Sequence, residues 1–438
     1  MGRGRLPACS SIDATDFHTF FADKVSEIRS STANSPPPLF TSAPAGCVFD
    51  DFRSLSADDV ITLVRTLPDK QCASDPLPTS LLKENVDILA PFLVELFNRC
   101  LSSGSVPSLF KSAFVTPLIK KSNLDPSDTR SYRPISNLSV LSKLLERLVA
   151  RQFIDYLNLS GLLPELQSAY RAFHSTETAV LKVLADILRE VDAGNLVVLV
   201  LLDLSAAFDT VDHATLLERL KTSYGLGGTV LDWFTSYLSG RTQHVRCGNS
   251  SSVPTPVTCG IPQGSVLGPI LFILYTAFLS RLIQNHGLNP HMYADDTQIY
   301  GACSPAEVLQ LQQRVAACID DVAAWMRENR LQFNAAKTEV IWCATSRRQY
   351  QIPHNPIRVG LDDIHPVSSV RDLGIFLDSD ISMKKHVAKT VSSCFAVLRQ
   401  IRSIRRSVTR PVVMSLITAL VMTKLDYGNA TLAGLPSR

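Results

Sequence analysis

The sequence lacks the patterns by which cysteines bind zinc or form a disulfide framework. Ten cysteines are spread over 438 residues, and they form neither a Cys-x-x-Cys nor a pair with histidines at zinc spacing. No signal peptide precedes the first helical segment. These absences predict reduced thiols and an intracellular protein, nuclear or cytoplasmic and not secreted.

The chain also has little excess charge and no nucleotide-binding glycine loop. Its formal charge is only +3, so affinity for nucleic acid would require a local basic surface. No GxxxxGK[ST] occurs, and "GLGG" at 225–228 lacks the GxGxxG spacing and is typical of a turn. Ordinary ATPase chemistry is therefore disfavoured.

Long apolar runs are scarce. The longest, "VLGPILFILYTAFLSRLI" at 266–283, contains Pro269 and is interrupted by Arg281. Its length alone does not exclude a membrane span, but the proline favours a buried helix. We therefore expect a protein without a membrane partner.

The composition is that of a globular protein, since 45% of the residues are hydrophobic and the length allows two or three packed subdomains. Residues 1–55 are predicted to hold an N-terminal helix over 13–29 followed by the proline-rich linker "STANSPPPLFTSAPAG". Amphipathic segments over 56–97 predict a helical lead-in to the strand-like "AFVTPLIKK".

The clearest strand lies in "NLVVLVLLDLSAAFDTVDH". Seven consecutive apolar residues, Leu196 to Leu202, run directly into Asp203, which predicts a strand buried on both faces. A carboxylate at the end of such a strand is costly without compensation, which favours metal coordination. Asp209 and Asp212 are expected to cap the following helix.

A second carboxylate position is "NPHMYADDTQIY" at 289–300. β-branched and aromatic residues flank Asp295 and Asp296, which predicts a tight hairpin. Other Asp-Asp pairs, at 50–51, 58–59, 320–321 and 362–363, are typical of solvated turns or helix starts. Together with Asp203, the pair at 295 would supply three carboxylates, the donor set for two Mg²⁺ ions about 3.5 to 4 Å apart and for phosphoryl transfer.

Several ordered motifs resemble the reverse transcriptases of LINE-type (non-LTR) retrotransposons. They are "LLDLSAAFD", "GIPQGSVLGPILF", "YADD", "LQFNAAKTE" and "VRDLGIFLD", preceded by "AFVTPLIKK" and "SYRPISNLSVLSKLLERLV". The resemblance spans residues 98–378. It implies an α+β fold, a right-hand polymerase with fingers and palm over 98–378 and a partial helical thumb over 379–438. It also implies RNA-directed DNA synthesis from an RNA template, a DNA primer and dNTPs.

The resemblance assigns catalytic roles residue by residue. It makes Asp203, Asp295 and Asp296 ligands of two Mg²⁺ ions, with Mn²⁺ as a substitute. Phe208 matches the bulky residue that crowds the sugar 2′ position, although an ordinary core aromatic is the alternative. Lys337 in "NAAKTE" matches a lysine that protonates the leaving pyrophosphate, and a merely exposed lysine is the alternative.

Substrate contacts follow from the same resemblance. Gln263 and Gly264 in "GIPQGS" would lie along the incoming nucleotide and template. Arg133 in "SYRPIS" and either Lys120 or Lys121 in "PLIKK" would bind the triphosphate. Gly374, after Leu373 in "DLGIFLD", would permit close backbone contact with the primer end.

A run without acidic residues extends from Ser382 to Arg410. An apolar stripe of Val387, Val391, Cys394, Leu398 and Ile401 predicts one amphipathic helix with basic residues on its other faces. Arg399, Arg402 and Arg406 are expected to contact the phosphate backbone, with a solvated basic face as the alternative.

Complete LINE-type proteins generally carry an endonuclease, and nothing before residue 98 offers its His and Asp clusters. The sequence therefore predicts a truncated copy, with target nicking supplied in trans. A second function remains open: a catalytically inactive, nucleic-acid-binding remnant. An intron-encoded maturase is a third reading, and it would require RNA-binding modules that this sequence does not show.

Overall fold

The computed structural model describes residues 12–69, 75, 77–121, 123–360 and 362–433, and its fold is mixed α+β with several sheets. The expected α+β class is thus confirmed. The chain forms two compact units. The first comprises Met1–Pro164, Ser205–Thr276 and Trp325–Gln332, and the second comprises Glu165–Leu204, Ala277–Ala324 and Phe333–Arg438. The subdomain boundaries expected at 55, 97 and 378 stay a prediction.

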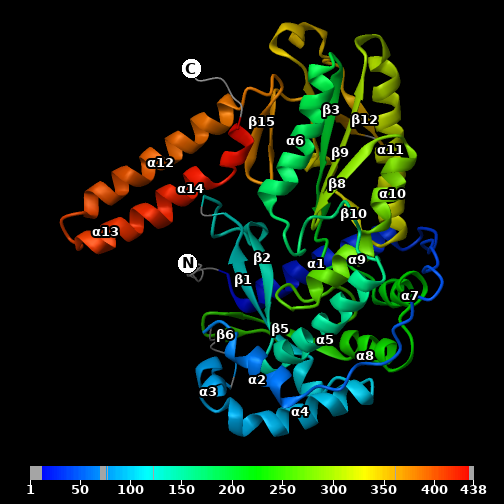
Figure 1. The fold of residues 1–438 in the computed structure, drawn as a ribbon, viewed down its shortest axis with the longest axis vertical. Helices are drawn as coiled ribbons and strands as arrows, with labels where there is room; N and C mark the ends of the chain where they lie inside the picture. Colours follow the sequence, from blue (N-terminus) through cyan, green and yellow to red (C-terminus); the bar gives the residue numbers. More distant parts are fainter. Residues whose placement is uncertain (1–11, 70–74, 76, 122, 361, 434–438) are drawn as a thin grey trace. The chain divides into compact units, whose positions relative to one another are not determined.

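The sheet of the first unit pairs β1 antiparallel with β2 and parallel with β5 (Figure 1). Its strands are β1 (Ser112–Ile119), β2 (Tyr132–Asn137), β5 (Arg241–Cys247), β6 (Ser250–Ser251) and β7 (Thr255–Val257). Helix α1 (Ala14–Thr32) confirms the predicted N-terminal helix. Its Phe17 is fully buried, with the ring centroid 4.8 Å from that of Tyr132 on β2. Helix α1 is therefore part of the core of this unit.

The remaining helices of the first unit are α2 (Ala57–Arg65), α3 (Thr79–Glu84), α4 (Val86–Ser102), α5 (Val140–Leu159), α7 (His213–Tyr224), α8 (Gly228–Leu238) and α9 (Gly268–Thr276). Helix α9 comes from the longest apolar run, and every one of its residues except Pro269 is buried. The run breaks at Ala277, where α10 (Phe278–Asn285) begins. None of the described helices is long and apolar enough to cross a membrane.

The second unit is built on an antiparallel sheet in the order β11-β3-β9-β8. Its strands are β3 (Leu196–Leu202), β8 (Asn289–Tyr293), β9 (Asp296–Cys303) and β11 (Glu339–Cys343). Every residue of β3 is buried except Leu201, which is half-buried, so the predicted buried strand is confirmed. Helix α6 (Thr176–Asp192) lies along this sheet (Figure 1). Its Val183 and Ile187 belong to one core cluster with Val197, Leu199 and Tyr300 of the sheet.

Two short hairpins follow the central sheet along the chain. Strands β12 (Ile357–Val359) and β13 (Asp362–Ile364) pair with each other, as do β14 (Ser369–Asp372) and β15 (Ile375–Asp378). Val370, Ile375 and Leu377 join the core beneath α6. The other elements are β4 (Leu204–Ser205), β10 (Gln332–Phe333), α11 (Val308–Glu328), α12 (Lys384–Ile404), α13 (Arg410–Ile417) and α14 (Thr423–Asp426).

The prediction of one basic helix from Ser382 to Arg410 was wrong. Helix α12 begins at Lys384 and ends at Ile404, and α13 starts afresh at Arg410 with a proline in its first turn. Cys394 and Ile401 are buried against Val421, and Val397 packs beside them. Three members of the expected stripe remain about two-fifths exposed: Val387, Val391 and Leu398. The buried face is rotated because the chain reverses after Ile404 and packs the following helices back along α12.

Candidate active site

Asp295 and Asp296 lie at the tip of the hairpin formed by β8 and β9. Tyr293 is opposite Asp296 in the ladder, so Ala294 and Asp295 form a two-residue turn. Ala294 has φ +57°, the positive φ that such tight hairpin turns require. The predicted hairpin is confirmed, and it presents two adjacent carboxylates at the end of a buried sheet.

Asp203 reaches the same end of the sheet from the neighbouring strand. The β3–β9 ladder finishes with Leu202 opposite Thr297, so the next residue of each strand is Asp203 and Asp296. Burial, together with the charges of Asp295 and Asp203, raises the pKa of Asp296 to about 6. Three carboxylates from two strand systems therefore act on one another electrostatically, and a cation would relieve their repulsion.

The carboxylate of Asp203 already has two cationic or polar donors. Lys337 Nζ lies 3.2 Å from Asp203 Oδ2, and Asn334 Nδ2 lies 3.3 Å from the same oxygen. Both come from the turn around the 3₁₀ segment η4 (Ala335–Lys337), whose backbone is tied to Asp203 by the Asn334 N–H. The Lys337 side chain is 65% exposed, so its ammonium can exchange this partner for another anion.

The donor chemistry suits a hard cation, since all three groups are carboxylates. Within the described part of the chain, however, no three His, Cys, Asp or Glu side chains are drawn together closely enough to hold a metal ion. The three carboxylates thus lie at the same end of the sheet but are not arranged around one point, and their role as metal ligands stays a prediction.

Gln167, which the sequence reasoning missed, holds the turn before Asp295. Its Oε1 accepts hydrogen bonds from the N–H groups of Ala294 at 2.9 Å and Ala169 at 3.0 Å, and its Nε2 donates to the Ala294 carbonyl at 3.3 Å. The backbone on either side pairs with Met292 of β8. Gln167 is fully buried. A lone glutamine in "LQSAYR" offers only a weak sequence signal, because its burial depends on the hairpin.

In the first unit, Gln263 is bound to a carboxylate of the same unit. Gln263 Nε2 lies 2.8 Å from both oxygens of Asp209, and burial raises the pKa of Asp209 to about 6. Asp209 therefore does not cap a helix, contrary to the prediction. Asp212 does cap α7, since its side chain accepts from the Thr215 N–H.

Gly264 is required by packing. Its φ is +121°, and an added Cβ would lie 2.6 Å from the Ser136 carbonyl oxygen on β2. The Ser136 N–H donates to the Gln263 carbonyl at 2.7 Å. The absence of a side chain at Gly264 thus lets the loop pack closely against the backbone of β2 in the structure without substrate.

The other expected substrate residues of the first unit lie near the surface. Phe208 is half-buried and stacks on Phe272, with ring centroids 4.5 Å apart and planes at 22°. Arg133 is exposed. Lys120 and Lys121 are both exposed, and Lys120 donates to the Arg130 carbonyl at 2.8 Å. These contacts favour Lys121 of the two lysines for binding an added anion.

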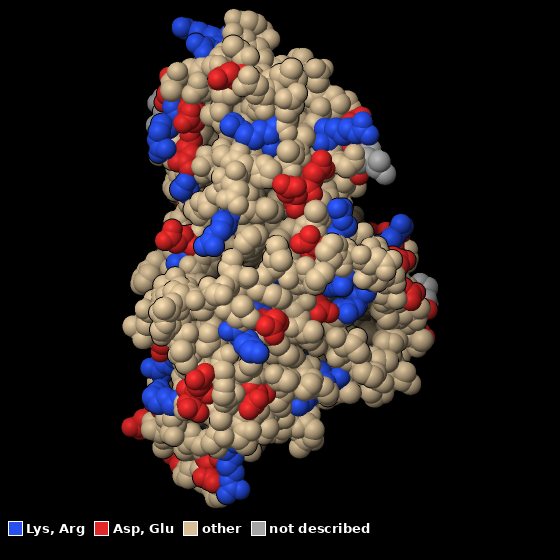
Figure 2. All heavy atoms as spheres, turned by 90° about the vertical axis from the view of Figure 1, so that its right-hand side faces the viewer, with Lys and Arg blue, Asp and Glu red and all other residues tan. Residues whose placement is uncertain are grey.

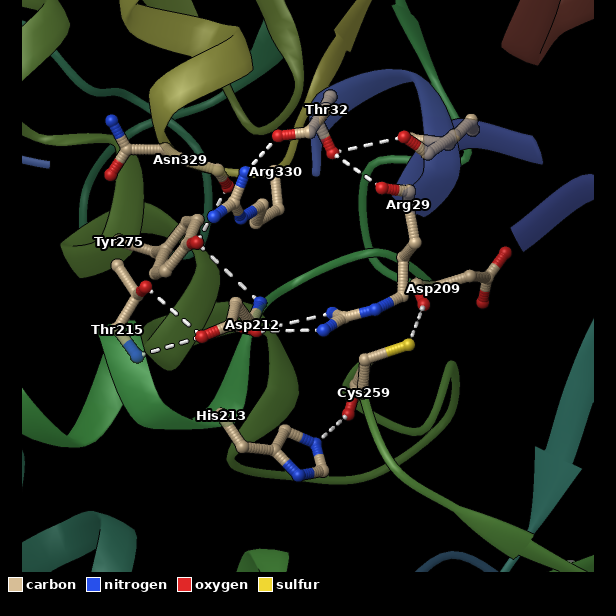
Figure 3. A network of polar contacts seen from close by, with 12 residues as sticks. Arg29, Thr32, Asp209, Asp212, His213, Thr215, Cys259, Tyr275, Asn329 and Arg330 are labelled. Carbon is tan, nitrogen blue, oxygen red and sulfur yellow. Dashed lines mark hydrogen bonds and ion pairs between the residues drawn. The ribbon is translucent and has the colours of Figure 1, made fainter. Parts of the chain in front are cut away.

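A polar network ties α1 to the segment that carries Asp209 (Figure 3). Arg29 of α1 donates two hydrogen bonds of 3.1 Å to Asp212, whose backbone N–H lies 3.4 Å from the Tyr275 hydroxyl. Tyr275 in turn donates to the Asn329 carbonyl, and Arg330 donates to the Thr32 carbonyl at the end of α1. The N-terminal helix therefore braces the loop after β4.

Among the expected nucleic-acid contacts, Gly374 lies in the β14–β15 turn with φ +95°. An added Cβ would meet the Tyr427 ring at 3.1 Å, and the Tyr427 hydroxyl donates to the Leu373 carbonyl. Arg399 and Arg402 are exposed on α12, while Arg406 is exposed beyond its end. On the face in Figure 2, basic and acidic groups are interspersed, in keeping with the small net charge.

Several known proteins are similar to most of this chain. The family described as reverse transcriptase (RNA-dependent DNA polymerase) matches residues 119–375. The chain is 30% identical over 358 residues to a probable RNA-directed DNA polymerase from transposon BS of Drosophila melanogaster, a match that covers 80% of this chain and 38% of that protein. It is 27% identical over 340 residues to the RNA-directed DNA polymerase from mobile element jockey of Drosophila melanogaster. This match covers 76% of this chain and 36% of that protein.

A third relative is the Pol polyprotein of the type-1 retrotransposable element R1 from Bradysia coprophila, 26% identical over 389 residues. That match covers 85% of this chain and 37% of the relative. In all three comparisons the chain spans less than two-fifths of its relative.

Proposed function

Because this chain belongs to the reverse transcriptase family and is related to the polymerases of non-LTR retrotransposons, we propose that it is an RNA-directed DNA polymerase. It would transfer nucleotides from dNTPs to a primer 3′-hydroxyl on an RNA template, with fingers, palm and a helical thumb. The observation that carries the proposal is the meeting of Asp203 with Asp295 and Asp296 at one end of the β3–β9–β8 sheet.

In this proposal Asp203, Asp295 and Asp296 hold two Mg²⁺ ions, for which Mn²⁺ can substitute. The ions would lower the pKa of the attacking hydroxyl and neutralise charge on the leaving pyrophosphate. Lys337 contacts Asp203 in the structure without substrate, and its side chain is largely exposed. When substrate is bound, this side chain would move to the pyrophosphate and donate a proton to it.

The substrate roles extend the same proposal. Arg133 and Lys121 bind the triphosphate with exposed cationic groups. Gln263 and Gly264 line the nucleotide and template through a loop that Asp209 and β2 hold in place. Gly374 supports the primer end at the β14–β15 turn.

Phe208→Val is expected to improve ribonucleotide use while leaving dNTP extension within a few-fold of the wild type. The ring is half-buried on Phe272, and a shorter side chain would open space for a 2′-hydroxyl. Single-nucleotide incorporation assays with a dNTP and with the matching rNTP measure the ratio of the two incorporation rates. A variant that keeps its dNTP rate and its full rejection of rNTPs would return Phe208 to a purely packing role.

Replacing Arg399, Arg402 and Arg406 together with Gln is expected to weaken primer–template binding. The three side chains are exposed, so the fold should survive, and circular dichroism checks this. Each lost phosphate contact should make the plot of log affinity against log salt shallower by roughly 0.7 to 0.9. An unchanged slope in a folded triple variant would identify these arginines as a solvated face.

A binding protein without polymerase activity is the second candidate, and the exposed Arg399, Arg402 and Arg406 on and beyond α12 favour it, because they could hold a primer–template without catalysis. Primer extension on an RNA template with Mg²⁺ or Mn²⁺ separates the two. Extension by the wild type supports the polymerase. Salt-dependent binding of the same primer–template without any extension selects the binding protein.

A further inference from the structure

A buried polar pair joins strand β9 to the turn that precedes Gly374. Gln298 lies two residues after Asp296 on β9, so both side chains stand on the same face of the strand. Its Nε2 donates to Asp372 Oδ1 at 2.6 Å. The two residues are 1% and 3% exposed. The pair is therefore shielded from bulk water.

The second atom of each group is the informative one. Gln298 Oε1 and Asp372 Oδ2 are both buried and have no hydrogen-bond partner among the residues that the structure describes. Two buried acceptors left unsatisfied in one pair would cost several kcal/mol. A proton on Asp372 Oδ2 converts it into a donor for Gln298 Oε1, which gives both atoms a partner.

We propose that Asp372 is a positioning residue: as a neutral carboxylic acid, it closes a ring of two hydrogen bonds with the Gln298 amide and fixes the Leu373–Gly374 turn to the strand that carries Asp296. This inference rests on the proposed function, since it takes that turn as the primer support. Burial, together with the charge of Asp296, raises the pKa of Asp372 to about 7, so the carboxyl group is mostly neutral below that pH.

The ring matters because the turn belongs to a separate two-stranded ladder. Strands β14 and β15 pair only with each other in the described sheets. Backbone hydrogen bonds from the Val367 N–H to the Val340 carbonyl and from the Ala344 N–H to the Ser379 carbonyl hold the open end of this hairpin to β11 and the residue after it, whereas the Gln298–Asp372 pair holds its turn end to β9. Leu373 adopts φ +43°, a conformation disfavoured for its type, and Tyr427 holds its carbonyl. Gln298 is only two residues from Asp296 on β9, so a displacement of Gln298 would also displace Asp296. The pair thus couples the position of the Leu373–Gly374 turn to that of the carboxylates.

Asp372→Asn and Asp372→Ala test the proposal, with Asp363→Asn on the exposed face of β13 as the control. Asparagine presents an acceptor and a donor like the neutral acid and should keep the KM for primer–template near the wild-type value. Alanine removes the ring and should raise that KM about tenfold, with the KM for dNTP unchanged. An Asn variant as impaired as the Ala variant would overturn the proposal, because a charged carboxylate would then be required.

The pH dependence of unfolding gives a readout that needs no polymerase activity. The folded pKa of Asp372 is about 7 against an ordinary value of 3.8, so the folded state binds more protons between these values. The wild type should therefore lose stability relative to Asp372→Asn as pH rises from about 4 to about 7. The carboxylate of Asp296 faces this pair from β9 and its charge acts on Asp372. The same comparison in an Asp296→Asn background removes this second titrating group, and the difference between the two proteins should persist there.

The two readouts separate the two hypotheses. If the wild type does not extend any primer, the proposed function fails, and the unfolding difference still tests the acid–amide ring. If the wild type extends primers but Asp372→Asn unfolds with the same pH dependence as the wild type, the neutral acid is refuted and the polymerase proposal stands.

Discussion

Asp295→Asn and Asp203→Asn are each expected to slow primer extension about a thousandfold. Asparagine keeps the size of the side chain but replaces one oxygen with an amide and removes the charge, so it is a poor ligand for Mg²⁺. A metal ligand worth about 4 kcal/mol in the transition state corresponds to this loss of rate. Single-turnover extension on an RNA template measures it.

The folds of these variants should be intact. Asp203 loses an ion pair with a largely exposed Lys337, and such pairs contribute little to stability. Asp58→Asn, in an Asp-Asp pair at the exposed start of α2, serves as the matched control and should extend normally. Extension near the wild-type rate by either active-site variant would remove both carboxylates from the metal assignment.

Gln167→Ala is expected to slow extension about a hundredfold without altering the carboxylates themselves. The substitution removes the amide that holds both the N–H and the carbonyl of Ala294. A displacement of about 1 Å at a catalytic group costs about this much in rate. Burst kinetics with saturating primer–template and dNTP measure the chemical step, and thermal unfolding monitors the loss of buried hydrogen bonds.

A second substitution tests whether Gln167 acts through the turn. Ala294 has φ +57°, which glycine adopts without the strain that alanine carries. Adding Ala294→Gly to Gln167→Ala should recover part of the lost rate, on the order of tenfold. A full rate for Gln167→Ala alone would show that the hairpin positions Asp295 without this glutamine. A loss of rate that Ala294→Gly does not recover would show that Gln167 does not act through the Ala294 turn.

The sequence by itself determined the local parts of this site. Seven consecutive apolar residues predicted a buried strand, with the carboxylate after Leu202 at its end, and β3 has this form. The β-branched and aromatic flanks of Asp295 specified the hairpin. The order of the motifs specified the reverse transcriptase family. Such features depend on neighbours within a few residues, where periodicity and turn preferences act directly.

Only the tertiary structure decided which polar groups meet. The contacts of Gln167 with Ala294, of Gln298 with Asp372 and of Lys337 with Asp203 each join segments that are distant in the chain. A buried amide or carboxylate has no periodic signature, because its stability comes from partners that folding brings within hydrogen-bond distance. For the same reason the rotated buried face of α12 could not be predicted: it depends on where the chain turns back after Ile404 and which residues then pack against it.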